Sequence, residues 1–357
     1  MIGFVRYGGV SAKLYALSGN LLTEDDYKNL LNQKSVPDIV RYLQSTKMYG
    51  DTLGTLNADQ IHRRDLENLL EEDLLKDIKK IFSFFVTFDR NFMHLLFYRY
   101  EVENLKIAIR SVLNKEEYNI NEMKRRFFDL GERSTIDPVK ILGAKNQDEI
   151  LDVLSGTPYQ EVVRNAFASY KQTSPINLIG IVENALDSWL LAKTISASKN
   201  LGTSDQAIVK EIEGERADIT DIEWLVRIKA FYDLKPEEAY NSLLPFHFRL
   251  RPDHLHAMCD SKGLKELVDV IKEGPYSDVY KELTEENALS RITLLGRRYL
   301  RLKAKGSITK LGNFSIATYF HYVLLKEFEI MDVATITEGV RYGIKPDEIK
   351  ERLVIKL

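Results

Sequence analysis

Apolar residues recur every three or four positions through a stretch between Gly54 and Gly131 that contains neither glycine nor proline. The first part of this pattern comprises Leu66, Leu69, Leu70, Leu74, Ile78, Ile81 and Phe85. The second part starts near Asp89 and comprises Phe92, Leu95, Leu96, Tyr100, Leu105, Ile109 and Leu113. Such spacing places each set on one face of an α-helix. We therefore expect two long antiparallel helices in this stretch.

The remainder of the chain also has a helical pattern, because no segment alternates convincingly between apolar and polar residues. Further stretches without glycine or proline lie between Gly214 and Pro236, between Pro275 and Gly296, and between Gly312 and Gly339. A β-protein would need a turn about every 8–12 residues. Thr23, followed by three acidic residues, and Ser35, followed by Pro37 at the second helical position, both look like helix N-caps. The pattern predicts an all-α protein.

Two sequence elements occur three times in the same order. The first is a helix that ends in a tyrosine, and it spans Ile39 to Tyr49, Ile150 to Tyr159 and Leu267 to Tyr276. The second is a Glu-Asn-x-Leu motif at the expected start of a long helix, and it begins at Glu67, Glu183 and Glu286. Both elements return after more than 100 residues, a period far longer than that of a solenoid repeat.

A third repeated element is an acidic residue followed three positions later by Asn or Asp. The pairs are Glu101 with Asn104, Asp218 with Asp221, and Glu329 with Asp332. A charged residue follows six positions after each pair: Arg110, Arg227 and Glu338, with the arginine of the last copy displaced to Arg341. These residues are candidates for a partner interface, where they would contact the partner or orient an arginine that does. The alternative is a structural role, in which each ties its helix to a neighbouring loop.

Three elements in one order, three times, predict three copies of a helical unit. We place the units at residues 1–115, 116–234 and 235–357. As a pair of antiparallel helices rising 1.5 Å per residue, each unit would be about 25–32 Å long. Because the acids recur in every copy, a single active site does not explain them, and we expect no catalytic residue.

The charge balance argues against a nucleic-acid partner. The chain has 357 residues, with 50 Lys and Arg against 53 Asp and Glu, whereas phosphate-binding proteins are usually basic. The densest basic run contains Arg297, Arg298 and Arg301, and it could face anionic lipid or an acidic partner. The alternative is an ordinary solvated helix face.

Other sequence features limit the class of protein. A single cysteine, Cys259, excludes an intramolecular disulfide framework and indicates a reducing compartment. No stretch approaches the roughly 18–20 consecutive apolar residues of a membrane span, and the N-terminus lacks the pattern of a signal peptide. We therefore expect any membrane contact to be peripheral.

Cofactor and metal sites are not expected. The chain has neither of the glycine-rich motifs that cradle nucleotide phosphates. His254, His256 and Cys259 invite a zinc interpretation, but residues two apart on a helix point to different faces, and no second His or Cys cluster lies nearby. We expect this segment to lie on the surface or in a loop.

Three stretches carry a family resemblance that extends over essentially the whole chain. They are Ser18 to Leu31, Tyr100 to Arg110 and Leu325 to Asp332. These residues resemble the C subunit of archaeal and bacterial V-type (A-type) rotary ATPases, whose eukaryotic counterpart is the V-ATPase d subunit. The third copy departs from the family pattern, because Met331-Asp332 stands where a basic residue and Asn are usual.

The resemblance implies three similar three-helix units around a pseudo-threefold axis, forming a funnel. It also implies a non-catalytic central-stalk subunit on the cytoplasmic face of the membrane. Its partners would be the axle subunits and the proteolipid of the membrane rotor ring, with any membrane contact made through the ring. The ATP chemistry would then lie on another chain. Two alternatives stay open: a generic helical scaffold in another assembly, and an all-α enzyme with an active site between units.

Overall fold

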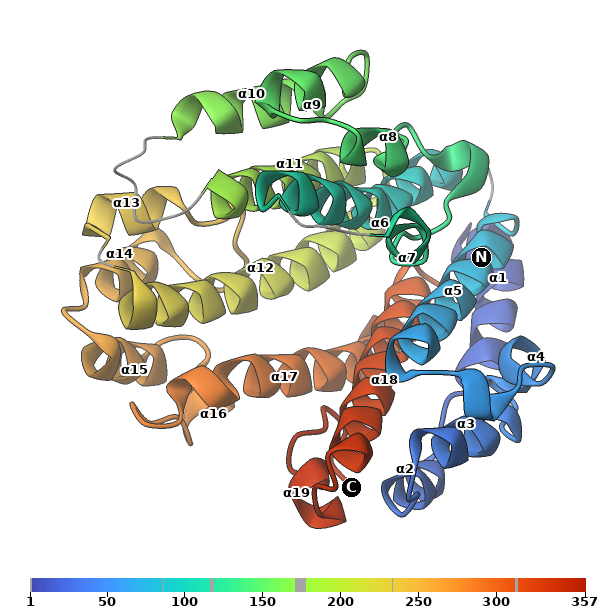
Figure 1. Ribbon diagram of the computed structural model, residues 1–357. Helices are drawn as coiled ribbons and strands as arrows, with labels where there is room; N and C mark the ends of the chain where they lie inside the picture. The colour runs from blue at the N-terminus through green and yellow to red at the C-terminus, as the bar shows by residue number, and fades with distance from the viewer. Residues whose placement is uncertain (1, 86, 116–118, 171–177, 233, 312–313) are drawn as a thin grey trace. The chain divides into compact units, whose positions relative to one another are not determined.

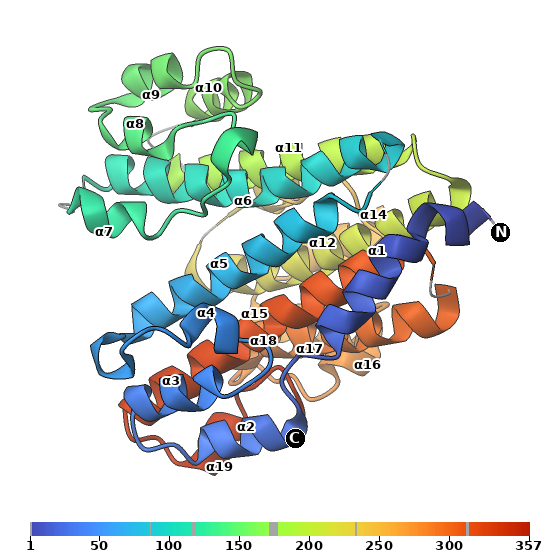
Figure 2. The same ribbon diagram turned by 90° about the vertical axis from the view of Figure 1, so that its right-hand side faces the viewer.

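The computed structural model describes residues 2–85, 87–115, 119–170, 178–232, 234–311 and 314–357. Throughout these ranges the chain forms helices and contains no β-strand, which confirms the all-α prediction (Figures 1 and 2). No described helix combines the length and the apolar character needed to cross a membrane.

The helices alternate between short and long. The short ones before α5 are α2 (Glu24–Leu31), α3 (Val36–Gln44) and α4 (Gly50–Leu53), with the 3₁₀ turn η1 (Ala58–Gln60). The short ones after α6 are α7 (Ile120–Lys124), η2 (Gly131–Arg133), α8 (Pro138–Leu142), α9 (Gln147–Val153), α10 (Gln160–Ser169), α13 (Pro236–Asn241), α14 (Pro252–Asp260), α15 (Leu264–Glu273), α16 (Ser277–Tyr280) and α19 (Pro346–Lys350). The long ones are α1 (Ile2–Ser18), α5 (Arg63–Phe82), α6 (Thr87–Leu113), α11 (Leu178–Ser198), α12 (Thr203–Phe231), α17 (Ala288–Leu311) and α18 (Ala317–Arg341).

The contacts divide the chain into two compact units. Unit 1 comprises Met1–Phe88 and Thr293–Leu357, and unit 2 comprises Asp89–Ile292. The boundary falls between α5 and most of α6, so the predicted antiparallel pairing of these two helices stays a prediction, as does the division into three domains. Unit 1 joins the two ends of the sequence.

In unit 1, α18 is the central helix, and both α1 and α5 pack against it (Figure 1). Helix α5 runs antiparallel to α18. Tyr322 of α18 bonds Asp77 of α5, and Lys326, one turn further along α18, bonds Asp73, one turn earlier on α5. Much of α18 is buried, since its residues face α1, α2, α3, α5 and α19. The sequence of a helix that is enclosed in this way is apolar on most sides of the helix, whereas an amphipathic helix is apolar on one face only.

Unit 2 is built on α6, α11 and α12. Helices α6 and α11 are also antiparallel. Lys106 of α6 contacts Asp187 of α11, and Arg110, one turn further along α6, contacts Glu183, one turn earlier on α11. A core of buried, mostly aliphatic side chains runs from Val102 through α8, α9 and α10 to Leu186 and includes Tyr159. The short helices thereby cover the apolar faces of the long ones.

Local sequence signals explain several of the helix ends. Thr23 caps α2 in a capping box with Asp26, and Ser35 caps α3 with Pro37 in its first turn, as predicted. The Glu-Asn-x-Leu motif is less accurate as a start signal. It begins four or five residues inside α5 and α11 and two residues before α17.

Glycine does not break every helix that contains it. Gly214 lies inside α12, and a Cβ there would stand 2.7 Å from the Cβ of Phe248. Gly339 lies inside α18, and a Cβ there would stand 2.5 Å from Ile349. At both positions the chain that follows the long helix packs directly on the helix backbone, which leaves no room for a side chain.

Candidate functional site

The three repeated acids are buried on three long helices, and each accepts a hydrogen bond from a tyrosine. Glu101 lies on α6, Asp218 on α12 and Glu329 on α18, and all three are at most 4% exposed. The O–H···O distances are 2.6 Å from Tyr159 to Glu101, 2.6 Å from Tyr276 to Asp218 and 2.7 Å from Tyr49 to Glu329. The structure thus joins the tyrosine element to the acid element. We call each pair a carboxylate clamp.

Each acid also accepts hydrogen bonds from the backbone of a loop. Glu101 accepts from the N–H of Thr135 and Ile136. Asp218 accepts from the N–H of Phe248, Arg249 and Leu250, at 2.7 to 3.2 Å. Glu329 accepts from the N–H of Leu22 at 2.6 Å. A short helix starts two residues after Ile136, Leu250 and Leu22, so the three loops are equivalent.

The Asn or Asp of each copy fixes a second segment, 22–24 residues further along the chain. Asn104 exchanges two hydrogen bonds with the backbone of Phe128, at 2.7 and 2.9 Å. Asp221 accepts from Leu244 N–H, and Asp332 accepts from the N–H of Val354 and Ile355. All three side chains are at most 2% exposed. These contacts tie each long helix to the loop that follows it.

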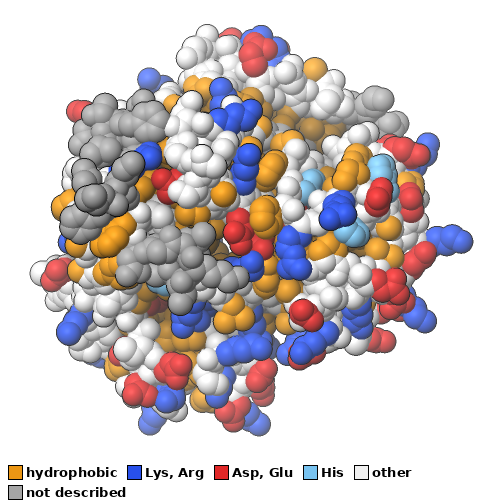
Figure 3. Space-filling view, turned by 180° about the vertical axis from the view of Figure 1, so that it is seen from behind, with side chains coloured by type: hydrophobic (Ala, Val, Ile, Leu, Met, Phe, Trp, Pro, Cys, Tyr) orange, Lys and Arg blue, Asp and Glu red, His pale blue; other side chains and the backbone are white. Residues whose placement is uncertain are grey.

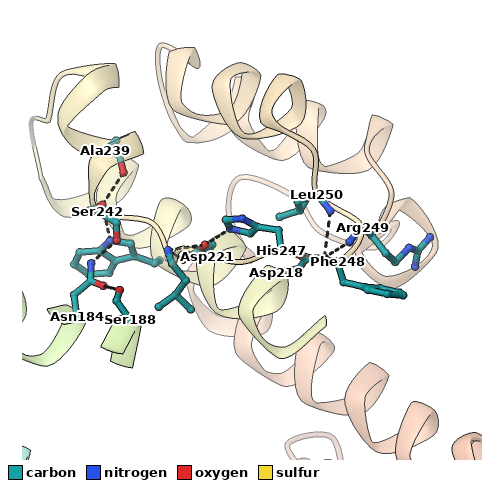
Figure 4. Close-up of polar contacts among 12 residues, drawn as sticks. Asn184, Ser188, Asp218, Asp221, Ala239, Ser242, His247, Phe248, Arg249 and Leu250 are labelled. Carbon is teal, nitrogen blue, oxygen red and sulfur yellow. Dashed lines mark hydrogen bonds and ion pairs between the residues drawn. The ribbon is translucent and has the colours of Figure 1, made fainter. Parts of the chain in front are cut away.

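The second copy adds a histidine to this arrangement. His247 Nε2 lies 2.6 Å from the Asp221 carboxylate (Figure 4). Burial raises the pKa of Asp221, and the hydrogen bond from His247 opposes that shift. Nearby, the Asn184 amide donates to the Ser242 carbonyl, and Trp224 Nε1 donates to the Ser242 hydroxyl at 3.0 Å. The loop before His247 is therefore held by side chains from both α11 and α12.

Asp332 makes stability depend on pH. Burial raises its pKa to about 6, although the N–H groups of Ile355 and Val354 oppose that shift. The folded state therefore binds this proton more tightly than the unfolded state, where the pKa is about 3.9. The contribution of Asp332 to stability must fall as pH rises from about 4 to about 6. Chemical denaturation at several pH values should show that the free energy of unfolding falls less steeply with pH for Asp332→Asn than for the wild-type chain. An equal slope for the two proteins would contradict the raised pKa of Asp332.

The arginines of the repeat have different partners in different copies. Arg110 reaches from α6 to Glu183 of α11 at 2.6 Å. Arg227 turns back to Glu223 on its own helix at 2.5 Å. In the third copy, Arg341 lies 3.6 Å from Glu338, which also contacts Arg63 of α5 at 3.0 Å. A cation therefore joins neighbouring helices in the first and third copies, although in the third it comes from Arg63, a residue that no sequence pattern singled out.

The basic run of α17 is not a uniform basic face. Arg297 is exposed and Arg301 is half-buried. Arg298 donates hydrogen bonds to the carbonyls of Leu353 and Glu351, at 2.8 to 3.0 Å. Arg298 thus fixes the C-terminal segment, together with Asp332. On the face drawn in Figure 3, basic and acidic side chains are interspersed among hydrophobic ones.

The segment considered for zinc is a helix. His254 and His256 lie on α14, where His256 is exposed and stacks on Tyr240 with ring centroids 4.2 Å apart. Cys259 is fully buried, so the predicted surface placement is wrong for this residue, and burial raises its pKa to about 11. Across the ranges that the structure describes, no group of three or more His, Cys, Asp or Glu side chains could hold a metal ion.

A buried ionic cluster beside the third clamp was not predicted from the sequence. Lys326 is 0% exposed, and its Nζ lies 3.1 Å from Asp73, 3.9 Å from Glu329 and 3.8 Å from the centre of the Tyr49 ring. Burial lowers the pKa of Lys326 and raises that of Glu329. The signal was present on α5, because Asp73 lies at helical spacing within the apolar face that contains Leu66, Leu70 and Leu74.

The same position is filled differently in the three copies. Three residues before the acid stand Tyr98, Glu215 and Lys326. In the first copy, Tyr98 packs against Tyr159, with ring centroids 6.3 Å apart, and Tyr159 packs against Trp189 at 5.0 Å. The third copy has the ion pair of Lys326 with Asp73 instead. The copies therefore share a backbone plan but differ in the chemistry of their cores.

Comparison with known proteins identifies the family of this chain. The family model described as "ATP synthase (C/AC39) subunit" matches residues 10–352. Similar relatives include proteins named as the C subunit of A-type ATP synthase. One from Pyrococcus abyssi is 23% identical over 98% of this chain and 90% of its own length. One from Methanosphaera stadtmanae is 24% identical over 99% and 89%, and one from Thermococcus onnurineus is 25% identical over 98% and 90%. The chain belongs to the ATP synthase (C/AC39) subunit family.

Proposed function

We propose that this chain is a non-catalytic central-stalk subunit of a V/A-type ATPase or ATP synthase. In this proposal it forms a socket that links the axle subunits to the membrane rotor ring, so that rotation couples ATP hydrolysis or synthesis to ion transport. The observation that carries the proposal is the carboxylate clamp, which is built three times on long helices in a chain of this family.

The clamps support a mechanical role because they make the helical frame stiff. A carboxylate that is buried and bonded to several donors is costly to separate from them. Asp218 bonds three backbone N–H groups and a tyrosine, so the loop at 248–250 cannot leave α12 without breaking three bonds, and Tyr276 holds a second segment through the fourth. A part that transmits torque needs this resistance to deformation.

The differences between copies support a socket with one preferred orientation. A strictly symmetric socket would accept an asymmetric axle in three equivalent ways. Here the surroundings of the clamp differ from copy to copy. The first copy has the aromatic ring of Tyr98, the second has His247 bonded to Asp221, and the third has the ion pair of Lys326. Side chains at the rims of the copies would differ accordingly, and an axle could then distinguish them.

For the repeated Asn and Asp residues we propose a positioning role rather than direct contact with a partner. Asn104, Asp221 and Asp332 are buried and already bonded to loops. Arg297 is the better candidate for a contact with the ring or with lipid headgroups, because it is exposed whereas Arg298 is bonded within its own unit. The chain would lie on the cytoplasmic face as a peripheral subunit.

Affinity purification from the native host would test the proposal. The tagged chain, extracted in mild detergent, should co-purify with an axle protein, a ring proteolipid and the catalytic ATPase subunits, as identified by mass spectrometry. Arg297→Glu should weaken recovery of the proteolipid and leave recovery of the axle unchanged. Absence of all three partners, from a host that expresses them, would contradict the proposal and favour a helical scaffold in another assembly.

A further inference from the structure

The third clamp differs from the other two in what it joins. Glu101 and Asp218 each bond a tyrosine 58 residues further along the chain. Glu329 bonds Tyr49, which is 280 residues earlier, so this clamp closes the two ends of the sequence onto each other. The first and second clamps hold a segment that continues directly from the long helix, whereas the third holds a segment from the opposite end.

Tyr49 belongs to a segment that leaves the long helices after α1 and returns to them at α5. Residues 19–62 carry α2, α3 and α4 and connect α1 to α5. Both α1 and α5 pack directly against α18, and together the three helices form the frame of unit 1. Residues 19–62, which we call the N-terminal flap, are therefore anchored at both ends. They contact α18 through α2 and α3, α5 through α4, and α19 through α2.

The flap is fixed to its acid by fewer hydrogen bonds than the matching segments of unit 2. Glu101 accepts from two backbone N–H groups and from the hydroxyls of Ser134 and Thr135. Asp218 accepts from three backbone N–H groups. Glu329 accepts from one, that of Leu22, within the part of the chain that the structure describes.

Two further polar contacts hold the flap. The Thr52 hydroxyl donates a hydrogen bond to Asp73 of α5, and the ammonium group of Lys326 on α18 lies over the Tyr49 ring. Lys326 Nζ lies 3.8 Å from the Tyr49 ring centre, and its ion pairs, with Asp73 of α5 and Glu329 of α18, are made within the frame. Buried charges of this kind gain little net stability, because desolvation offsets their attraction. The flap also packs apolar side chains onto the frame, with Tyr27, Leu30 and Ile39 all buried. Its attachment thus combines apolar packing, two hydrogen bonds to Glu329, one hydrogen bond from Thr52 to Asp73 and the contact of Lys326 with the Tyr49 ring.

We infer that the N-terminal flap is a latch that opens from α18 as one cooperative unit while α1, α5 and α18 stay folded. The purpose of this latch rests on the proposed function. A stalk subunit with one releasable segment can change the shape of its surface to bind or release a partner while its long helices remain folded. Segments of low local stability are where such motions occur in other proteins.

Hydrogen exchange of the isolated full chain, followed by mass spectrometry, tests this inference. In the wild-type protein, peptides from residues 22–53 should exchange at least about tenfold faster than peptides from α18, because they need only the local opening. Tyr49→Phe removes the hydroxyl that donates to Glu329 and should speed exchange of the flap about tenfold further, with little change in α1, α5 and α18. The control is Tyr159→Phe, which removes the matching hydroxyl in unit 2 and should leave the flap unchanged.

Two results would overturn the inference. One is equal protection of the flap and α18 in the wild-type chain, which would mean that they open only together. The other is a Tyr49→Phe effect spread evenly over all of unit 1. Either result would remove the latch and leave the stalk function standing. Failure of the affinity purification would instead remove its purpose and leave the exchange pattern intact.

Discussion

Replacing Lys326 by Met should lower the free energy of unfolding by about 3–5 kcal/mol at pH 7. The substitution keeps most of the apolar stem but removes the charge that lies 3.1 Å from Asp73 and 3.9 Å from Glu329. Both carboxylates are buried, so the loss leaves negative charge without compensation in a site that excludes water. Urea denaturation followed by circular dichroism would measure the change.

The pH dependence of this variant provides an internal check. Burial raises the pKa of Glu329 and Lys326 opposes that shift, so without Lys326 the folded state should bind a proton on Glu329 at a higher pH than the unfolded state, where the pKa is about 4.3. The stability of the variant should therefore rise as pH falls from 7 towards 5, and part of the loss should be recovered.

A matched control lies on α5, the helix that carries Asp73. Lys80 is mostly exposed and lies 3.8 Å from Asp77, so Lys80→Met should change stability by less than about 1 kcal/mol. Equal effects of the two substitutions would contradict the role of Lys326 as a compensating buried charge.

Replacing Asp218 by Ala should destabilise the chain by about 3–5 kcal/mol, since large effects arise when a buried hydrogen-bond network loses its centre. The carboxylate is 0% exposed and accepts bonds from Phe248, Arg249 and Leu250 N–H and from Tyr276. Each donor left without an acceptor costs about 1–3 kcal/mol, less where water can reach it. Thermal unfolding by calorimetry would measure the loss.

Tyr276→Phe provides the comparison for Asp218→Ala, because it removes one of the four donors and leaves the carboxylate in place. Its cost should be about 1–3 kcal/mol. If the two variants were equally stable, the backbone bonds at residues 248–250 would contribute nothing, and the clamp would be no more than a tyrosine–carboxylate pair.

Much of the fold could be predicted from local signals in the sequence. The apolar spacing at Leu66, Leu70 and Leu74 identified a long helix, and Thr23 and Ser35 identified two helix starts. These signals are short-range, because a capping residue and an apolar stripe act within a few turns of the same helix. Helix ends were less accurate where packing sets them, as with Gly214 and Gly339 inside α12 and α18.

The clamps could be predicted only in part. Repetition identified Glu101, Asp218 and Glu329 on one hand and Tyr49, Tyr159 and Tyr276 on the other, but it could not show which tyrosine meets which acid. Each acid bonds the tyrosine of the next copy, and the last acid bonds the first tyrosine. A periodic pattern is unchanged by such a shift of one copy, so only three-dimensional contacts reveal the connection.

The ionic cluster was hidden for a different reason. Lys326 sits in a helix whose other residues are largely apolar, and one lysine there is easily assigned to the surface. Its burial depends on Asp73, which is 253 residues away in the sequence. Compensation of charge at such separation follows from packing of α5 on α18, and no local pattern encodes it.

ATP-driven ion transport in membrane vesicles would test the central claim most directly. Vesicles from host cells that lack this chain should retain ATP hydrolysis by the catalytic part and lose ion uptake, because the axle and the ring would no longer be joined. Adding the purified chain should restore uptake, and adding Asp218→Ala chain should restore much less. Undiminished ion uptake in vesicles without the chain would contradict the socket role.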